Sequence, residues 1–183
     1  MKKLLEKFKQ EKKVISIYND PSDTANCWTG FVKEVDDDYV LIAHISENGF
    51  YGGFCLHAID GIFNIEQGTS YEKKTHKLYE LKKQKHPSIS FDLSKGLLEA
   101  VLGYAQNEKI FISIALVEDD SYPPTGLIEE MTEEFICLKN FTSSGEENGF
   151  SYIKKEDIYQ LFVDSLPEQI NSSVISSMRP VGG

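Results

Sequence analysis

The stretch "TGFVKEVDDDYVLIAHIS", Thr29 to Ser46, recurs as "TGLIEEMTEEFICLKNFT", Thr125 to Thr142. In both copies a Thr-Gly pair precedes a partly apolar segment, a polar turn follows, and an apolar run closes the stretch. Asp favours turn conformations. A near-continuous apolar run rich in β-branched and aromatic residues is typical of a strand buried on both sides. The repetition predicts two copies of one structural unit.

The similarity extends on both sides of this stretch. Upstream, "VISI" (14–17) is paired with "FISI" (111–114) after a one-residue gap, and "KKLLEKF" (2–8) resembles "KGLLEAV" (95–101) as a helix before the strand. Downstream, "AIDGIFNIE" (58–66) is paired with "DIYQLFVDS" (157–165). Each unit is therefore predicted to be a helix followed by five short strands.

Gly30 and Gly126 fall at the start of the strand that is expected to bend. A Gly there lets a strand coil sharply or lets another backbone approach. Five short, bent strands do not hide their edges as a flat sheet, and they are expected to curl into a small barrel. The predicted fold is mainly β with some α, with two tandem five-stranded small barrels, each preceded by an α-helix.

The expected organisation has four parts along the chain. They are a first helix and barrel (1–66), a helical linker (67–93), a second helix and barrel (94–165), and a flexible tail (166–183). In the linker, Tyr71, Leu78 and Leu81 predict an exposed helix of modest amphipathicity, which Pro87 ends. Ser94 is expected to cap the next helix.

Composition limits the class of protein. Hydrophobic residues make up 40% of the 183 positions, which is enough to bury a core. The three cysteines, Cys27, Cys55 and Cys137, are odd in number and widely spaced, which favours a reducing compartment over a disulfide framework. The basic N-terminal stretch lacks the apolar core of a signal peptide, and no apolar run is long enough for a membrane span. A soluble, cytoplasmic protein is expected.

The net charge of −10 is unevenly distributed. Residues 1–86 carry 13 Lys and 13 Asp or Glu, whereas residues 87–183 carry 6 Lys or Arg and 16 Asp or Glu. All of the excess acidity therefore lies in the second half. An acidic surface repels a phosphate backbone unless a local basic face overcomes it.

A helix and strand followed by "TGFVKEVDDDYVLIAHI" resemble the first motif of the Sm-like fold, the five-stranded barrel of Sm, LSm and Hfq proteins. The resemblance covers about 14–65 and 110–163, and the pattern is shared by other SH3-like barrels. It implies tandem Sm-like domains of a bacterial group. It also implies RNA binding by analogy with the fold.

The chain departs from that family at its second motif. The Ile/Leu-Arg-Gly of the nucleotide-contacting loop is absent, as is the Tyr-Lys-His signature of Hfq. The single arginine is Arg179. No RNA-binding residue can therefore be carried over from the family, and the acidic charge and lack of Arg disfavour nucleic acid as a partner.

Chemical motifs give little support for catalysis or a cofactor. Cys55 and His57, two apart in a strand, share a face, and with Cys27 and His44 they could hold Zn²⁺ tetrahedrally. The alternative is that these cysteines are small buried hydrophobes. The second copy has Asn140 in place of His44, so no metal or other cofactor is expected. No nucleotide-binding or catalytic signature is present, and the protein is not expected to be an enzyme.

The preferred hypothesis is a non-enzymatic binding or scaffold protein that engages a protein partner or associates with itself. The expected contact residues are Trp28, His44, Phe50 and Tyr51, because aromatic residues anchor interfaces and because the copies differ at these positions. The alternative is an RNA-binding module that uses the one basic cluster, which consists of Lys73, Lys74, Lys77, Lys82, Lys83 and Lys85.

Overall fold

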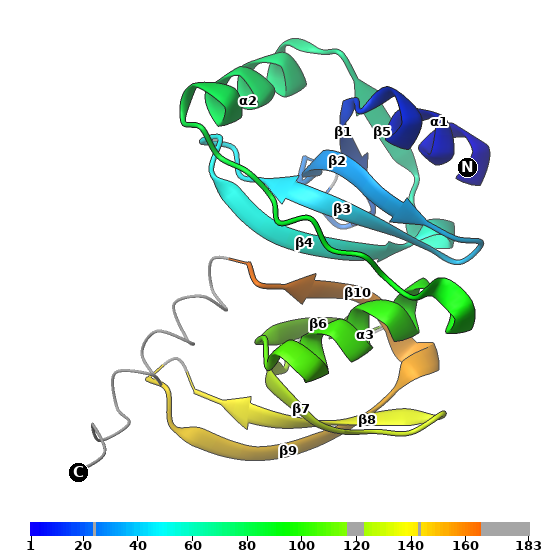
Figure 1. Cartoon of the computed structure of the whole chain (residues 1–183), viewed down its shortest axis with the longest axis vertical. Coiled ribbons are helices and arrows are strands. Elements are labelled where there is room, and N and C mark those ends of the chain that lie inside the picture. The colour runs from blue at the N-terminus through cyan, green and yellow to red at the C-terminus, as the bar shows by residue number, and fades with distance from the viewer. Residues whose placement is uncertain (24, 117–122, 143, 166–183) are drawn as a thin grey trace. The chain divides into compact units, whose positions relative to one another are not determined.

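The computed structural model describes residues 1–23, 25–116, 123–142 and 144–165 of the chain. The chain divides into two compact units, Met1–Val101 and Leu102–Gly183 (Figure 1). The finer boundaries expected from the sequence, near residues 66, 93 and 165, remain predictions. The expected flexible tail, 166–183, lies outside the described residues.

The first unit is built on five antiparallel strands in the order β5-β1-β2-β3-β4. They are β1 (Val14–Tyr18), β2 (Trp28–Val35), β3 (Tyr39–Ile45), β4 (Tyr51–Ala58) and β5 (Asn64–Gln67). The helices α1 (Lys2–Glu11) and α2 (Ser70–Leu81) precede β1 and follow β5. Two 3-10 turns, Ile59–Gly61 and Leu93–Lys95, complete the unit.

The second unit repeats this arrangement in the order β10-β6-β7-β8-β9. Its strands are β6 (Ile112–Leu116), β7 (Thr125–Met131), β8 (Phe135–Phe141), β9 (Glu147–Lys154) and β10 (Ile158–Val163). Helix α3 (Leu97–Glu108) precedes β6 and begins before the boundary between the units. The mainly β class with some α, predicted from the sequence, is confirmed.

The predicted closed barrels are not confirmed, because the sheet is open. In the described part of the first unit, β5 pairs with β1 and β4 pairs with β3. These two outer strands of the described part do not pair with one another, which a closed barrel would require. The prediction assumed that short strands must close to hide their edges. Here β5 is only four residues long and pairs with β1 alone, so it leaves little edge to hide.

The repeat is confirmed at the level of register. A bulge between Val32 and Glu34 of β2 has its counterpart between Ile128 and Glu130 of β7, 96 positions later in the chain. In the same way, β3 and β8 each shift register shortly before their last residue. Such bulges bend a strand and increase its twist, so the copies share curvature as well as order.

Two outer pairings proposed from the sequence are wrong. Left-handed Lys12 ends α1 and left-handed Lys109 follows α3, so these helix ends correspond. When these helix ends are aligned, α1 corresponds to residues of α3 that lie one helical turn further along the chain than the predicted pairing of 2–8 with 95–101. The 3-10 turns Ile59–Gly61 and Lys155–Asp157 also correspond. The predicted pairing of 58–66 with 157–165 is therefore displaced by three residues.

Strand β1 separates two layers of side chains in the first unit. On one face, Ile15 and Ile17 pack with Leu5 and Phe8 of α1. On the other face, Val14 packs with Tyr79 of α2. Alternation along a strand sends Ser16 and Tyr18 to the same face as Val14, so the polar and aromatic end of β1 faces α2.

Within the described residues, no helix is both long and apolar enough to cross a membrane.

Candidate functional site

The ends of four elements meet at one hollow in the first unit. Tyr18 ends β1, Trp28 begins β2, His44 is the next-to-last residue of β3, and Tyr71 lies in the first turn of α2. Because β1, β2 and β3 are antiparallel neighbours, the end of β1, the start of β2 and the end of β3 lie at one end of the sheet. The hollow measures about 560 Å³, and its lining is Tyr18, Ala25, Asn26, Cys27, Trp28, His44, Ser46, Glu47 and Tyr71.

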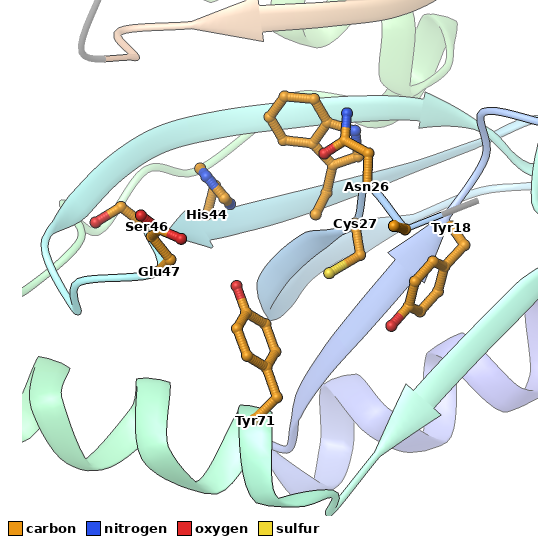
Figure 2. Close-up of a pocket in the computed structure, with 9 residues that line it drawn as sticks. Tyr18, Asn26, Cys27, His44, Ser46, Glu47 and Tyr71 are labelled. Carbon is orange, nitrogen blue, oxygen red and sulfur yellow. The ribbon is translucent and has the colours of Figure 1, made fainter. Parts of the chain in front are cut away.

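The orientation of Tyr71 makes the hollow partly aromatic. Figure 2 shows its side chain extending from α2 toward the strands, with the hydroxyl in the space between Glu47 and Cys27. The Tyr71 side chain remains 38% exposed, so a ligand can reach it. Tyr18 stands on the opposite side of Cys27 from His44 (Figure 2).

His44 is held as a neutral imidazole. Its Nδ1 lies 2.9 Å from the backbone oxygen of Thr29. A carbonyl oxygen can only accept, so Nδ1 carries the proton and Nε2 is left as an acceptor. Burial lowers the pKa of His44, against the opposing effect of the hydrogen bond to Thr29. The imidazole therefore brings no positive charge to the hollow at neutral pH.

Trp28 is positioned by two histidines. Its ring meets that of His44 edge-on at 5.3 Å between centroids and lies 6.0 Å from that of His57. His57 is fully buried, with Nδ1 3.2 Å from Nδ2 of Asn19. Burial, followed by the neighbouring His44, lowers the pKa of His57 to about 3. These contacts hold the indole at the edge of the hollow.

A chain of hydroxyl groups links the hollow to α2. The Oγ of Ser16 donates to Oε1 of Glu72 at 2.6 Å, and it lies 2.9 Å from Oγ1 of Thr29. Since Ser16 has a single proton, Thr29 donates to Ser16. Glu72 also closes a capping box by accepting from the backbone N–H of Thr69 at 2.8 Å. Burial opposes ionisation of Glu72, but these hydrogen bonds outweigh it and lower its pKa.

Replacing this carboxylate is expected to loosen α2. For Glu72→Gln we expect a loss of about 1.5–3 kcal/mol in the free energy of unfolding, because the charge is removed and one of the two acceptor oxygens becomes an NH2 group that faces a donor, Ser16 or the backbone N–H of Thr69. Denaturant titrations followed by the fluorescence of Trp28 measure it. Glu80→Gln, on the exposed surface of the same helix, is the control and should change stability by less than about 0.5 kcal/mol. Equal effects of the two variants would show that Glu72 does not anchor the helix.

The tyrosines of the hollow are surrounded by acidic groups. Burial, the hydrogen bond from its hydroxyl to Glu66 and the neighbouring Cys27 together raise the pKa of Tyr18. Burial raises the pKa of Tyr71 as well, and so do Cys27, Glu47 and Glu72, against the opposing effect of a hydrogen bond with Thr29. Both phenols are therefore neutral donors at physiological pH.

Four ligands for Zn²⁺ do not come together. Over the described ranges, no group of three or more His, Cys, Asp or Glu side chains is placed to hold a metal ion. Cys55 is buried within β4, whereas Cys27 is partly exposed at the hollow. The thiol of Cys27 lies 3.7 Å from Oγ1 of Thr29.

The structure separates the four predicted contact residues into two pairs. Trp28 and His44 line the hollow. Phe50 lies in the turn before β4, 50% exposed, with the ammonium of Lys82 3.6 Å from its ring centre. Tyr51 packs 4.7 Å from the ring of His86 and away from the hollow. As binding residues all four remain predictions, but only the first pair shares a cavity.

His86 fixes the segment that follows α2, a role that the sequence did not indicate. Its Nε2 lies 2.8 Å from the backbone oxygen of His44 and 3.1 Å from that of Gly53, and its Nδ1 lies 2.8 Å from the hydroxyl of Tyr79. The carbonyls can only accept, so Nε2 donates and Nδ1 accepts from Tyr79. This ring explains why Tyr51 is a packing residue.

Among its described residues, the second unit has no counterpart of the aromatic lining. Its residues at the positions of Tyr18, Cys27, Trp28 and His44, read from the shared registers, are Ala115, Pro123, Pro124 and Asn140. The hydroxyl pair beneath them is retained, with Ser113 Oγ and Thr125 Oγ1 2.7 Å apart. The hydroxyl pair thus belongs to the shared scaffold, whereas the aromatic lining distinguishes the first copy.

Sequence reasoning missed Tyr18, Tyr71 and Glu47 as lining residues. Tyr71, Leu78 and Leu81 predict an exposed helix of modest amphipathicity, and in α2 Tyr71 is 38% and Leu81 68% exposed. The buried positions of α2 are Glu72, Thr75 and Tyr79. The signal available in the sequence was the pattern Thr69-x-x-Glu72, a capping box that fixes where the helix begins.

Comparisons with protein-family models, with curated proteins and with solved structures find no match to this chain.

Proposed function

We propose that the protein is a non-enzymatic binding module whose first unit holds a segment of a partner protein in the hollow at the start of α2. One observation carries this proposal. Trp28 and His44, two positions at which the first copy departs from the second, contact one another on the wall of a single cavity. Divergence on a shared scaffold marks the place where function differs.

The size and lining of the hollow suit a side chain and its flanking backbone. Its volume of about 560 Å³ falls within the range of ligand sites in proteins. Its tryptophan and tyrosines are residue types that anchor interfaces. Its polar groups already hold the scaffold together, as the bond between His44 and the backbone of Thr29 illustrates. This favours binding over a chemical reaction.

We further propose that each unit is an Sm-like or SH3-like small barrel in its ancestry, opened at one side. The support is the strand order β5-β1-β2-β3-β4, a helix that precedes β1, and the bulge in β2. The function proposed above does not depend on this assignment.

Peptide selection on the full chain tests the proposed function. Peptides enriched from a random displayed library should bind the wild-type chain and lose about tenfold or more in affinity for Tyr71→Ala, because anchor residues typically contribute 2 kcal/mol or more. Tyr152→Ala removes an equally large ring, 71% exposed on β9 of the second unit, and should leave affinity unchanged. Equal losses in both variants, or none in either, would contradict the proposal.

A second candidate function, RNA binding, is favoured by the exposure of the lysine cluster. Its six lysines are all exposed on α2 and the turn that follows it. Affinity for single-stranded RNA that falls steeply with salt, and that Lys73→Gln and Lys77→Gln weaken while Tyr71→Ala does not, would favour this candidate over the hollow.

A further inference from the structure

We propose that the hollow of the first unit recognises a cationic side chain, the ammonium of a lysine or the guanidinium of an arginine, presented by the partner protein. This inference rests on the proposed function and specifies its ligand. Three independent features of the hollow support it. They are the charge of its lining, the hydrogen-bonding character of its polar atoms, and its aromatic faces.

The described lining of the hollow carries negative charge. Its nine described lining residues include one carboxylate, that of Glu47, and no Lys or Arg. Two further carboxylates lie just behind the lining. Glu66 accepts from the hydroxyl of Tyr18 at 2.9 Å, and Glu72 lies beneath Thr29 and Ser16. A cation that enters the hollow therefore meets attraction from several sides.

Two residues of the lining, His44 and Glu47, offer acceptors to a donor ligand, beside hydroxyl and amide groups that can both donate and accept. The Nε2 of His44 is an acceptor, because Nδ1 donates to the backbone of Thr29. Glu47 can only accept when it is ionised. A primary ammonium or a guanidinium, which has donors and no acceptor, matches this arrangement better than a carboxylate or a phosphate does.

Aromatic faces complete the site. Trp28, Tyr18 and Tyr71 all contribute to its lining. A cation near the face of Trp or Tyr gains about 0.5–2 kcal/mol, more when it is desolvated. The apolar stem of a long basic side chain can lie along the same rings while its head reaches Glu47.

The second unit provides the contrast. At the positions of Tyr18, Trp28 and His44 it has Ala115, Pro124 and Asn140, although its residues carry the acidic excess of the chain. Charge alone would direct a basic segment to the second unit. The combination of aromatic rings, acceptors and Glu47 directs it to the first.

A set of matched peptides tests this inference on the full chain. One short neutral peptide is made with a central Lys, Arg, norleucine or Nε-acetyllysine and is titrated while the fluorescence of Trp28, the chain's single tryptophan, is recorded. We expect the Lys and Arg peptides to bind about tenfold or more tightly than the norleucine and acetyllysine peptides. Glu47→Gln should reduce the affinity for the Lys peptide about threefold to tenfold and leave that for norleucine unchanged.

Glu133→Gln is the control, because it removes an exposed carboxylate from the second unit. Equal losses from Glu47→Gln and Glu133→Gln would show general attraction to an acidic chain and would overturn the inference. Equal binding of the norleucine and Lys peptides would overturn it too, while leaving the hollow as a protein-binding site. If none of the four matched peptides binds, and if the affinity of the library peptides is unchanged by Tyr71→Ala, the proposed function itself is contradicted. If butylammonium saturates the change in Trp28 fluorescence at a lower concentration than the Lys peptide does, the site binds a free amine and not a side chain of a partner protein.

Discussion

Gly30→Ala is expected to lower the free energy of unfolding by about 3 kcal/mol, the upper part of the range for overpacked cores. A Cβ at this position would overlap the backbone oxygen of Ala43 and lie 2.7 Å from Cγ2 of Ile42 and 2.9 Å from the carbonyl carbon of Ala43. The obstacle is mainly backbone, which cannot rotate away. Gly126→Ala should behave alike, since its Cβ would overlap the backbone oxygen of Lys139.

Gly103→Ala is the matched control for this substitution. Gly103 lies in α3, and a Cβ there meets no atom within 4 Å. Alanine is the better helix former, so this variant should gain about 0.5–1 kcal/mol. Thermal and denaturant unfolding followed by circular dichroism compare the variants under one condition. A Gly30→Ala protein as stable as the wild type would show that β2 and β3 do not approach as closely as described.

Acidification from about pH 7 to pH 5 is expected to destabilise the first unit by about 2 kcal/mol through His57 and by a smaller amount through His86, whose ring is partly exposed. Burial lowers the pKa of His57 to about 3, and burial lowers that of His86 to about 4 despite its hydrogen bonds to backbone oxygens. In the unfolded chain both rings bind protons below about pH 6.5, whereas in the folded chain they do not until pH 4 or below. The unfolded state therefore gains protons first, and stability falls as the pH falls through this window.

Denaturant titrations followed by the fluorescence of Trp28 at several pH values measure this slope. His86→Asn should flatten part of it. The lowered pKa of Glu72 adds a further loss only below about pH 4.5, so it does not contribute between pH 7 and pH 5. Stability that is constant or rises across this interval would contradict the burial of these two rings.

The sequence was sufficient to predict the repeat and its strands, because those depend on local chemistry. The turn at Asp36 illustrates this, since its Oδ1 accepts from the backbone N–H groups of Asp38 and Tyr39. In the second copy, Thr132 accepts from Glu134 and Phe135 in the same way. Turns in which an Asp or Thr side chain accepts hydrogen bonds from the nearby backbone can be predicted from the sequence, because the residue type and its position determine them.

The glycine-rich loops of the two copies differ in sequence but share features of backbone conformation. Gly49 bonds to the oxygen of Ser46 as Gly145 bonds to that of Thr142. Gly53 and Gly149 both adopt left-handed conformations. The loop is therefore conserved in form between the copies, and its sequence differences alone do not mark a site.

The candidate site was only half predictable. Trp28 and His44 could be singled out by comparing the copies, but Tyr71 comes from α2, whose side chains enter the site only through the tertiary fold. The buried face of α2 carries Glu72 and Thr75, which no apolar periodicity would select. The buried carboxylate of Glu72 depends on a hydrogen bond from Ser16, 56 residues earlier in the chain.

The most direct test of the central claim is a nuclear magnetic resonance titration of the full chain with a lysine-containing peptide from the selection. We expect the single indole N–H signal, from Trp28, and the backbone amides near Cys27, Glu47 and Tyr71 to shift together and to saturate with one dissociation constant. Shifts confined to the lysines of α2 or to the second unit, with the indole signal unmoved, would contradict it.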